Sequence, residues 1–305
     1  MRRSANVSTS TRSSPAVVTI GMFDGVHLGH QRLIARAVRV AHRHRGLSVG
    51  VTFDPDPQWV LDPKHARPPL MPLRRRVELM RLLGLDRVIV IAFTRAFAAL
   101  TPEQFVTRVL VRRLRARVVV VGDNFAFGKA RRGDVALLRR VGPCHGMRVI
   151  TVAAVTRGGQ PVSSSRIRGL VQSGHMREAH RLLGRPFELS GVVVRGSGRA
   201  TRLGFPTANV RLDNTLHPPH GVYHVQMAWS RRRANGLMNI GTRPTFGTGP
   251  VVCEVHLPRF RGRLYGQRVR MACLARLRDE RRFATPHALA AQIRRDLLRA
   301  GLAAS

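Results

Sequence analysis

The stretch A-V-V-T-I-G-M-F-D-G-V-H-L-G-H, residues 16–30, decides the fold of the first half of this chain. Its first five residues are apolar or β-branched, as in a strand that is buried on both faces. Three glycines follow at every fourth position, 21, 25 and 29, and we predict a helix over the next segment, 30–44. A strand that turns directly into a helix creates a phosphate site, because the helix N-terminus offers free N–H groups.

The same alternation continues outward from this unit. We predict further buried strands at 48–53, 87–93, 117–121 and 148–155, and helices at 73–83, 102–114 and 134–141. Thr101 and Pro102 give one of these helices a good start, with a capping hydroxyl and a proline at the first helical position. Strands that alternate with helices predict an α/β domain with a doubly wound, Rossmann-like parallel sheet.

The pattern changes after about residue 184. Short apolar runs at 190–195, 221–229, 236–240, 251–257 and 268–277 are separated by Gly/Pro turns, and a helix is predicted at 286–302. Such spacing predicts a small antiparallel β-barrel with a terminal helix. We therefore expect a disordered N-terminus over 1–14, a first domain over 15–184 and a second over 185–305.

The composition gives the class of protein. No apolar run approaches the roughly 18 residues of a membrane span, and Cys144, Cys253 and Cys273 fit neither a disulfide framework nor a zinc site. We expect a cytoplasmic protein with no membrane partner. The net charge of +37 would allow non-specific binding of nucleic acid. However, only Lys64 and Lys129 are lysines among the 53 basic residues, which is typical of a codon bias. The oligomeric state stays open.

Two histidines lie in the glycine-rich turn. His27 and His30 are three residues apart and would project to one side of the first helical turn. Each can donate a hydrogen bond to phosphate charge that develops in a transition state. Gly21, Gly25 and Gly29 let the backbone approach a ligand closely. A single histidine near a turn is more often an exposed residue without a function. Two histidines among three glycines at a strand-to-helix turn favour a phosphate site.

The spacing H-x-G-H resembles the nucleotidyltransferase superfamily. The longer string G-M-F-D-G-V-H-L-G-H-Q, 21–31, is similar to the FMN adenylyltransferase module of bacterial bifunctional riboflavin kinase/FAD synthetases. The segments 120–128 and 162–168 agree with that family in order and type. The resemblance implies that adenylyl transfer uses His27, His30 and Asn124. It also implies ATP and phosphate contacts from Gly21, Phe23, Gly25, Gly29, Ser164, Ser165 and Arg168.

A second set of motifs lies beyond residue 185. The glycine loop at 191–199 could wrap phosphates with its N–H groups, through Gly196 and Gly198. Thr207 and Asn209 offer oxygen ligands suited to Mg²⁺. They belong to the string L-G-F-P-T-A-N, 203–209, which also supplies Gly204.

This ordered set resembles the riboflavin kinase domain. By that resemblance Glu254 is the general base, which takes the proton from the ribityl 5′-hydroxyl of riboflavin as it attacks the γ-phosphate of ATP. The resemblance as a whole implies a flavin-nucleotide enzyme with ATP, riboflavin and FMN as substrates. FMN would form in the barrel, and FAD and pyrophosphate in the first domain. Two alternatives stay open: an enzyme with only the kinase activity, and a flavin-fold regulator that binds nucleic acid.

One departure from the family bears on the first domain. The family's F-x-P-H-P is F-D-P-D-P here, so Asp56 stands where histidine is usual. A carboxylate at the carboxyl edge of the sheet would repel incoming polyphosphate. We therefore expect adenylylation to be slower than the kinase reaction, unless Asp56 serves as a Mg²⁺ ligand.

Overall fold

The computed structural model of the chain describes residues 15–196, 203–242 and 251–302. The expected disordered terminus at 1–14 and Gly198 lie outside these ranges. Within the described ranges, no helix has the length and hydropathy needed to cross a bilayer.

The internal contacts divide the chain into two compact units, and each contains segments from distant parts of the sequence. Unit 1 consists of Met1–Met22, His30–Ala66 and Val77–Ala154. Unit 2 consists of Phe23–Gly29, Arg67–Arg76 and Val155–Ser305. The glycine-rich loop after the first strand thus packs with residues that follow it by more than a hundred positions. This division differs from a single cut at 184/185, which stays a prediction for the two functional domains.

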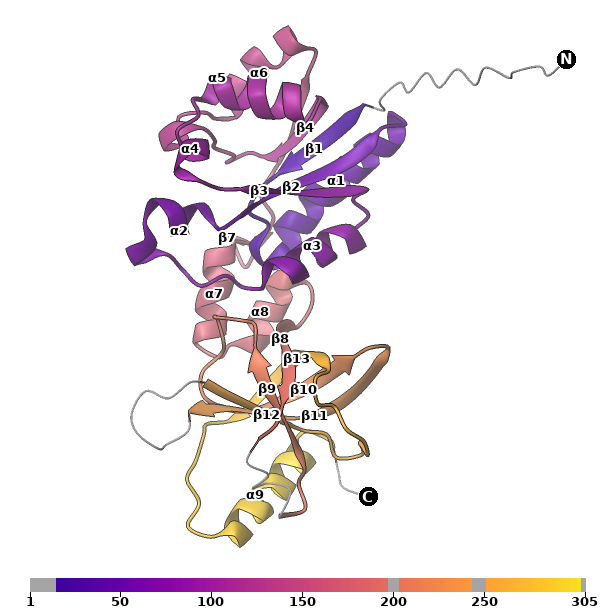
Figure 1. The fold of residues 1–305 in the computed structure, drawn as a ribbon, viewed down its shortest axis with the longest axis vertical. Helices are drawn as coiled ribbons and strands as arrows, with labels where there is room; N and C mark the ends of the chain where they lie inside the picture. The colour runs from indigo at the N-terminus through magenta and orange to yellow at the C-terminus, as the bar shows by residue number, and fades with distance from the viewer. Residues whose placement is uncertain (1–14, 197–202, 243–250, 303–305) are drawn as a thin grey trace, which may run out of the picture. The chain divides into compact units, whose positions relative to one another are not determined.

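Unit 1 contains the predicted parallel sheet, in which all five expected strands are confirmed (Figure 1). Among the described residues the strand order is β3-β2-β1-β4-β5. The strands are β1 (Ala16–Ile20), β2 (Leu47–Asp54), β3 (Arg87–Ala92), β4 (Ala116–Gly122) and β5 (Arg148–Val152). Every residue of the central β1 is buried, which explains its continuous apolar run. All neighbours are parallel, so the carboxyl ends of the strands meet at one edge.

Helices connect these strands. They include α1 (Leu28–Arg43), α2 (Pro57–Leu61), α3 (Leu73–Leu82), α4 (Arg95–Ala98), α5 (Pro102–Gln104) and α6 (Val135–Val141). The helices predicted at 30–44, 73–83 and 134–141 are confirmed, whereas the short helices at 57–61 and 95–98 were not predicted. Thr101 and Gln104 form the capping box that starts α5. The single helix expected at 102–114 instead continues as a π-helix, η3 (Phe105–Arg113). Its buried side chains, Phe105, Val106, Val109 and Leu110, cover one side in either helix type, so the apolar pattern does not distinguish the two.

Unit 2 contains a closed antiparallel barrel, as predicted, with the strand order β10-β11-β12-β9-β8-β13 among the described residues. The strands are β8 (Phe187–Val194), β9 (Thr207–Leu212), β10 (Gly221–Trp229), β11 (Arg232–Thr242), β12 (Val251–His256) and β13 (Arg268–Arg278). We did not predict β9, in which Thr207 and Asn209 were expected only as Mg²⁺ ligands. Polar and apolar side chains alternate over the six residues of β9, but the Gly/Pro turn just before Thr207 made this short alternation difficult to recognise.

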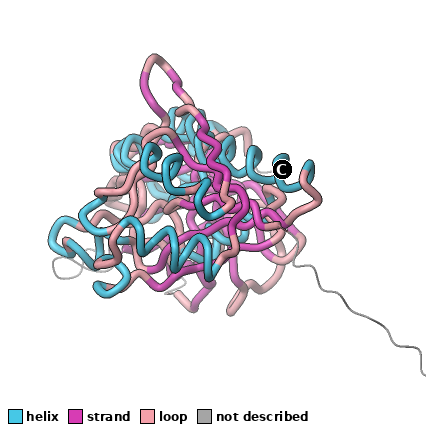
Figure 2. Tube along the Cα trace, turned by 90° about the horizontal axis from the view of Figure 1, so that it is seen from above, coloured by secondary structure: helices cyan, strands magenta, loops and turns pink. Residues whose placement is uncertain are grey.

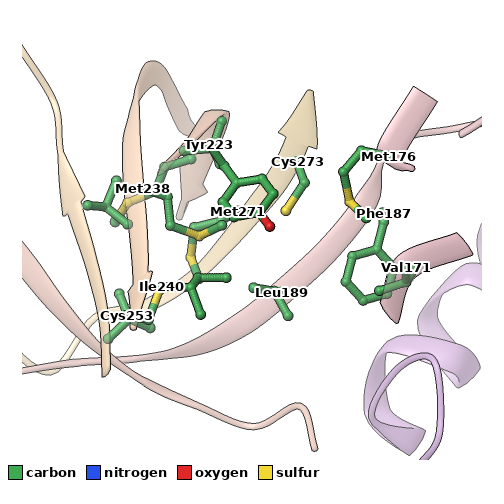
Figure 3. Packing of buried hydrophobic residues seen from close by; sticks show 14 of the residues in the cluster. Val171, Met176, Phe187, Leu189, Tyr223, Met238, Ile240, Cys253, Met271 and Cys273 are labelled. Carbon is green, nitrogen blue, oxygen red and sulfur yellow. The ribbon is translucent and has the colours of Figure 1, made fainter. Parts of the chain in front are cut away.

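Two helices extend the core of the barrel. The hairpin of α7 (Ser164–Gln172) and α8 (Met176–Leu183) shares one buried apolar cluster with the barrel strands. Figure 3 shows Val171 and Met176 beside Phe187, with Met238 and Met271 among the barrel side chains. Helices and strands alternate in unit 1, whereas strands dominate unit 2 beyond this hairpin (Figure 1). Figure 2 marks the helices, strands and loops of the described residues from a second direction.

The last helix, α9 (Pro286–Arg299), covers part of the outside of the barrel. Leu297 is buried against Phe205 and Leu237. The carboxylate of Asp296 accepts a hydrogen bond from Nε of Arg278 of β13 at 2.9 Å and forms an ion pair with Nη2 of the same residue at 2.9 Å, and both side chains are nearly buried. This ion pair joins the helix to the barrel.

Replacing Asp296 with alanine leaves the buried Arg278 guanidinium without its counter-charge. We expect the free energy of unfolding of the barrel to fall by about 3–5 kcal/mol. The measurement is urea unfolding followed by the fluorescence of buried Trp229, in a Trp59→Phe background so that one tryptophan reports. The control, Arg294→Ala on the exposed side of α9, should change this free energy by no more than about 0.5 kcal/mol. Equal effects of the two changes would contradict the importance of the ion pair.

Candidate functional site

The loop after β1 is shaped by two unusual backbone positions. Phe23 has a φ of 51° and is completely buried, so its expected contact with phosphate stays a prediction. Gly25 has a φ of 81°, and a Cβ built there would lie 2.6 Å from Cδ1 of Leu70. Both the conformation and the packing therefore require glycine at position 25. Gly25, which the sequence suggested as a point of close approach to a ligand, is therefore also required by the fold of the loop.

Asp24 fixes this loop to the rest of unit 2. Asp24 is 4% exposed, and its carboxylate accepts hydrogen bonds from the backbone N–H of Leu70 and pairs with Arg168 Nη2 at 2.9 Å. Arg168 also donates from Nε to the carbonyl of Pro68 at 2.8 Å. Ser164 donates its hydroxyl to the carbonyl of Asp24 at 2.8 Å. Two α7 residues expected to bind phosphate therefore hold the loop in this structure, and direct phosphate contact stays a prediction for both.

The remaining α7 residue of this set is more accessible. Ser165 is exposed and accepts a hydrogen bond from Arg67 Nη1 at 3.0 Å. Ser163, which precedes it, caps the helix by accepting a hydrogen bond from the N–H of Arg166. The serine run thus combines an ordinary helix cap with one hydroxyl at the surface beside a guanidinium.

His27 lies at the end of this loop and is 6% exposed. A Cβ on Gly29 would come within 3.2 Å of its imidazole, so the small residue leaves room for the ring. Burial and, secondarily, the positive charge of Arg185 lower the pKa of His27 from 6.5 to about 4. The imidazole is therefore neutral near pH 7 and can donate one N–H. His30 is half-buried in the first turn of α1.

Unit 1 brings other predicted residues to one sheet edge. Gly21 follows β1 and Asn124 follows β4, and these strands are parallel neighbours (Figure 1). The N–H of Gly21 donates to the carbonyl of Val51 at 3.1 Å, which ties the turn to β2. Asn124 is exposed beside Gly122. The carboxyl edge of the sheet thus presents an amide side chain next to the turn that leads to His27.

Asp56 follows the carboxyl end of β2, as expected, but its side chain has a structural task. It caps α2 by accepting a hydrogen bond from the N–H of Gln58 at 2.9 Å. The carboxylate therefore satisfies a backbone N–H of the first turn of α2, which has no partner within the helix. This capping interaction gives an aspartate at position 56 a structural role. The expected repulsion between its charge and polyphosphate stays a prediction.

The second site is set by the register of three barrel strands. Asn209 of β9 lies opposite Glu254 of β12, which lies opposite Asn239 of β11. Cys253 and Val255 on either side of Glu254 point into the core, so the row that contains Glu254 faces outward. Side chains of directly opposed residues share a face. The register therefore gathers two amides and one carboxylate.

Thr207 lies two residues before Asn209 and shares its face of β9. A Cβ on Gly196 would overlap the amide of Asn209, at 2.1 Å from Nδ2, so the glycine loop lies directly against this side chain. Gly204 has a φ of 84° and open space around it, so its backbone conformation explains the glycine. The structure thus brings together Thr207, Asn209, Glu254 and Gly196.

Three contributors were not identified from the sequence. Asn239 and His256 could have been found from strand periodicity, because each shares a face with Glu254. His256 is 8% exposed, and its Nδ1 lies 2.9 Å from the carbonyl of Pro206, just before Thr207. Arg185, which hydrogen-bonds the loop before His27, gave no sequence signal because its partners lie about 160 positions away.

Comparisons with known proteins divide the chain as the motifs do. A family model for FAD synthetase matches residues 9–166, and one for riboflavin kinase matches residues 183–302.

Relatives cover nearly the whole chain. The bifunctional riboflavin kinase/FMN adenylyltransferase of Escherichia coli (strain K12) is 38% identical, across 93% of this chain and 91% of its own. Its Pseudomonas fluorescens counterpart is 39% identical, across 92% and 90%. A Streptococcus pneumoniae crystal structure, titled as a macrolide-efflux protein, has a TM-score of 0.86 and 30% identity over 95% of both chains. By these matches, the chain belongs to the family of bifunctional riboflavin kinase/FMN adenylyltransferases.

Proposed function

We propose that the two residue sets described above divide the two reactions of this enzyme between them. The chain is a riboflavin kinase and an FMN adenylyltransferase, which converts riboflavin to FMN and FMN to FAD with ATP. The register that places Glu254 beside Asn209 is the observation that best supports the assignment of the kinase roles. It puts a proton acceptor next to oxygen donors on one face of the barrel.

In the kinase reaction, Glu254 accepts the proton of the ribityl 5′-hydroxyl. That oxygen forms a bond to the γ-phosphorus of ATP while the bond to the β-phosphate oxygen breaks, and ADP leaves. The Gly196 backbone supports the phosphates, and its contact with Asn209 holds the amide in place. A positioned base of this kind contributes roughly 10²–10⁴-fold to the rate.

The same face suits Mg²⁺ as the metal of this reaction. Thr207 and Asn209 present neutral oxygens on one side of β9, and a hard cation takes oxygen ligands. These two residues would hold the ion together with phosphate oxygens of ATP. Magnesium would supply charge neutralisation at the transferred phosphoryl group.

In the adenylylation reaction, an FMN phosphate oxygen attacks the α-phosphorus of ATP and pyrophosphate leaves. His27 donates its single N–H to the phosphate oxygens, where negative charge grows in the transition state. His30 and the exposed amide of Asn124 provide further donors. Ser165, beside Arg67, contacts the outer phosphates.

Two broader expectations accompany these roles. A cytoplasmic location is supported by the free cysteines, of which Cys253 and Cys273 are buried thiols within the barrel. The charge of +37 still predicts non-specific binding of nucleic acid at low salt. A purely regulatory protein is not favoured, because both sets of motifs are present.

Replacing Glu254 with glutamine removes the proton acceptor but keeps its shape. We expect FMN formation to fall by about 10²–10⁴-fold, while adenylylation of supplied FMN is unchanged. Chromatography of the flavins after incubation with riboflavin, ATP and Mg²⁺ measures both products, and the native protein should yield FMN first and FAD second. Glu178→Gln, on the exposed side of α8, is the matched control. Native-like FMN formation in Glu254→Gln would refute its role as base.

Replacing His27 with alanine should have the opposite selectivity. The loss of one preorganised donor typically lowers a rate by about 10²–10³-fold, so FAD formation from supplied FMN should fall by that factor. Riboflavin phosphorylation should not change. Because the pKa of His27 is about 4, the native rate should show no inflection from this residue between pH 6 and 8. Equal loss of both activities in the variant would contradict the assignment.

Asp56→Asn separates the charge at this position from its structural role. Asparagine caps a helix as well as aspartate does, so α2 keeps its hydrogen bond to Gln58 while the negative charge disappears. If repulsion of polyphosphate slows adenylylation, the variant should form FAD faster than the native enzyme. The comparison uses supplied FMN across a Mg²⁺ titration. A lower rate at every Mg²⁺ concentration would instead make the carboxylate a functional group.

A further inference from the structure

Arg185 lies in the turn between α8 and β8, within the residues that match riboflavin kinase. Its guanidinium donates hydrogen bonds from Nη2 to the carbonyl of Gly25 at 2.7 Å and from Nη1 to the carbonyl of Val26 at 3.1 Å. It also reaches the carbonyl of Leu183 at 3.3 Å, close to its own position in the chain. One side chain therefore joins the start of the barrel to the loop just before His27.

The geometry of these bonds requires arginine. The guanidinium is a planar fork whose two outer nitrogens can bind two successive carbonyls at once, whereas lysine carries a single point donor. Gly25 has the positive φ that the turn requires, so its carbonyl direction depends on external support. Fixing the carbonyls of Gly25 and Val26 fixes the peptide plane that leads into His27.

Two charged side chains lie near Arg185. It lines a small cavity with Arg75 and Glu188, and these two form an ion pair at 2.8 Å. Burial lowers the pKa of Arg185 to about 10, so the guanidinium stays charged near neutral pH. Asp24 of the same loop is already paired with Arg168. Arg185 therefore meets the loop through carbonyl oxygens, which accept hydrogen bonds from a cation.

We propose that Arg185 is a positioning residue for FMN adenylylation, although it lies in the riboflavin kinase part of the chain. It acts by holding the backbone before His27, so that the imidazole N–H points where phosphate charge develops. This inference rests on the proposed role of His27. Given that role, the first residues of the riboflavin kinase region also position a group that acts in FMN adenylylation.

Three variants of the full-length enzyme test this inference. Arg185→Met removes both the fork and the charge, Arg185→Lys keeps only the charge, and Arg181→Met makes the same change at an exposed position of α8. Adenylylation of supplied FMN and phosphorylation of riboflavin are measured on the same samples. The pKa of His27 is measured by NMR titration of its ring C–H signal, assigned by its loss in His27→Gln.

We expect kcat for adenylylation to fall about 10²-fold in Arg185→Met, which is the cost of misplacing a catalytic group by roughly 1 Å. It should also fall in Arg185→Lys, while Arg181→Met and every kinase rate stay at native values. The pKa of His27 should rise above its native value of about 4 in Arg185→Met and stay low in Arg185→Lys. This contrast separates positioning from electrostatics, and a merely structural role would not produce it.

Native adenylylation in both Arg185 variants would overturn the inference, as would parallel loss of the two activities. An equal loss in Arg181→Met would do the same. If His27→Ala keeps native adenylylation, the proposed role of His27 fails first, and the NMR titration still shows whether the charge of Arg185 acts on that side chain. The two failures are therefore distinguishable.

Discussion

A buried ion pair joins Asp24, in the loop after β1, to Arg168 of α7, and neither side chain is more than slightly exposed. Taking two charges out of water is costly, and the cost is recovered only where additional hydrogen bonds satisfy both groups. Here the backbone N–H of Leu70 and the carbonyl of Pro68 provide them. The interaction thus fixes three segments that are distant in sequence, and the position of His27 depends on it.

This constraint explains why the glycine-rich loop packs with unit 2 while the strand before it belongs to unit 1. The loop carries a residue pattern typical of phosphate binding, and several of its polar groups are hydrogen-bonded to other parts of unit 2. Ser164, Arg168 and Arg185 all contact its backbone or its carboxylate. A loop that is held from outside can keep a strained backbone, such as the positive φ of Phe23, and present a preorganised donor.

The barrel depends on a different constraint, which is strand register. Successive side chains of a strand point to opposite faces, so a slip of one residue would bury Glu254 and expose Cys253. The buried apolar residues on both sides of Glu254 exclude that slip. The same packing that stabilises the core therefore also holds Thr207, Asn209 and Glu254 on one face. His256 adds a bond to the carbonyl just before Thr207 and so fastens β9 at its first residue.

The sequence by itself determined the parallel sheet, the barrel and the family, and it suggested most of the candidate residues, because these depend on local periodicity and on motifs of contiguous residues. It did not show that the loop 23–29 and the segment 155–184 pack with the barrel. It missed β9, because a Gly/Pro turn obscured a short alternation, and it did not reveal the π-helical form of Phe105–Arg113. Only the tertiary structure decided the partners of Arg168, Asp56 and Arg185. Those partners are backbone groups and charges that folding brings close. A backbone carbonyl or N–H can belong to almost any residue type, so a hydrogen bond to it cannot be predicted from the sequence of the residue that provides it.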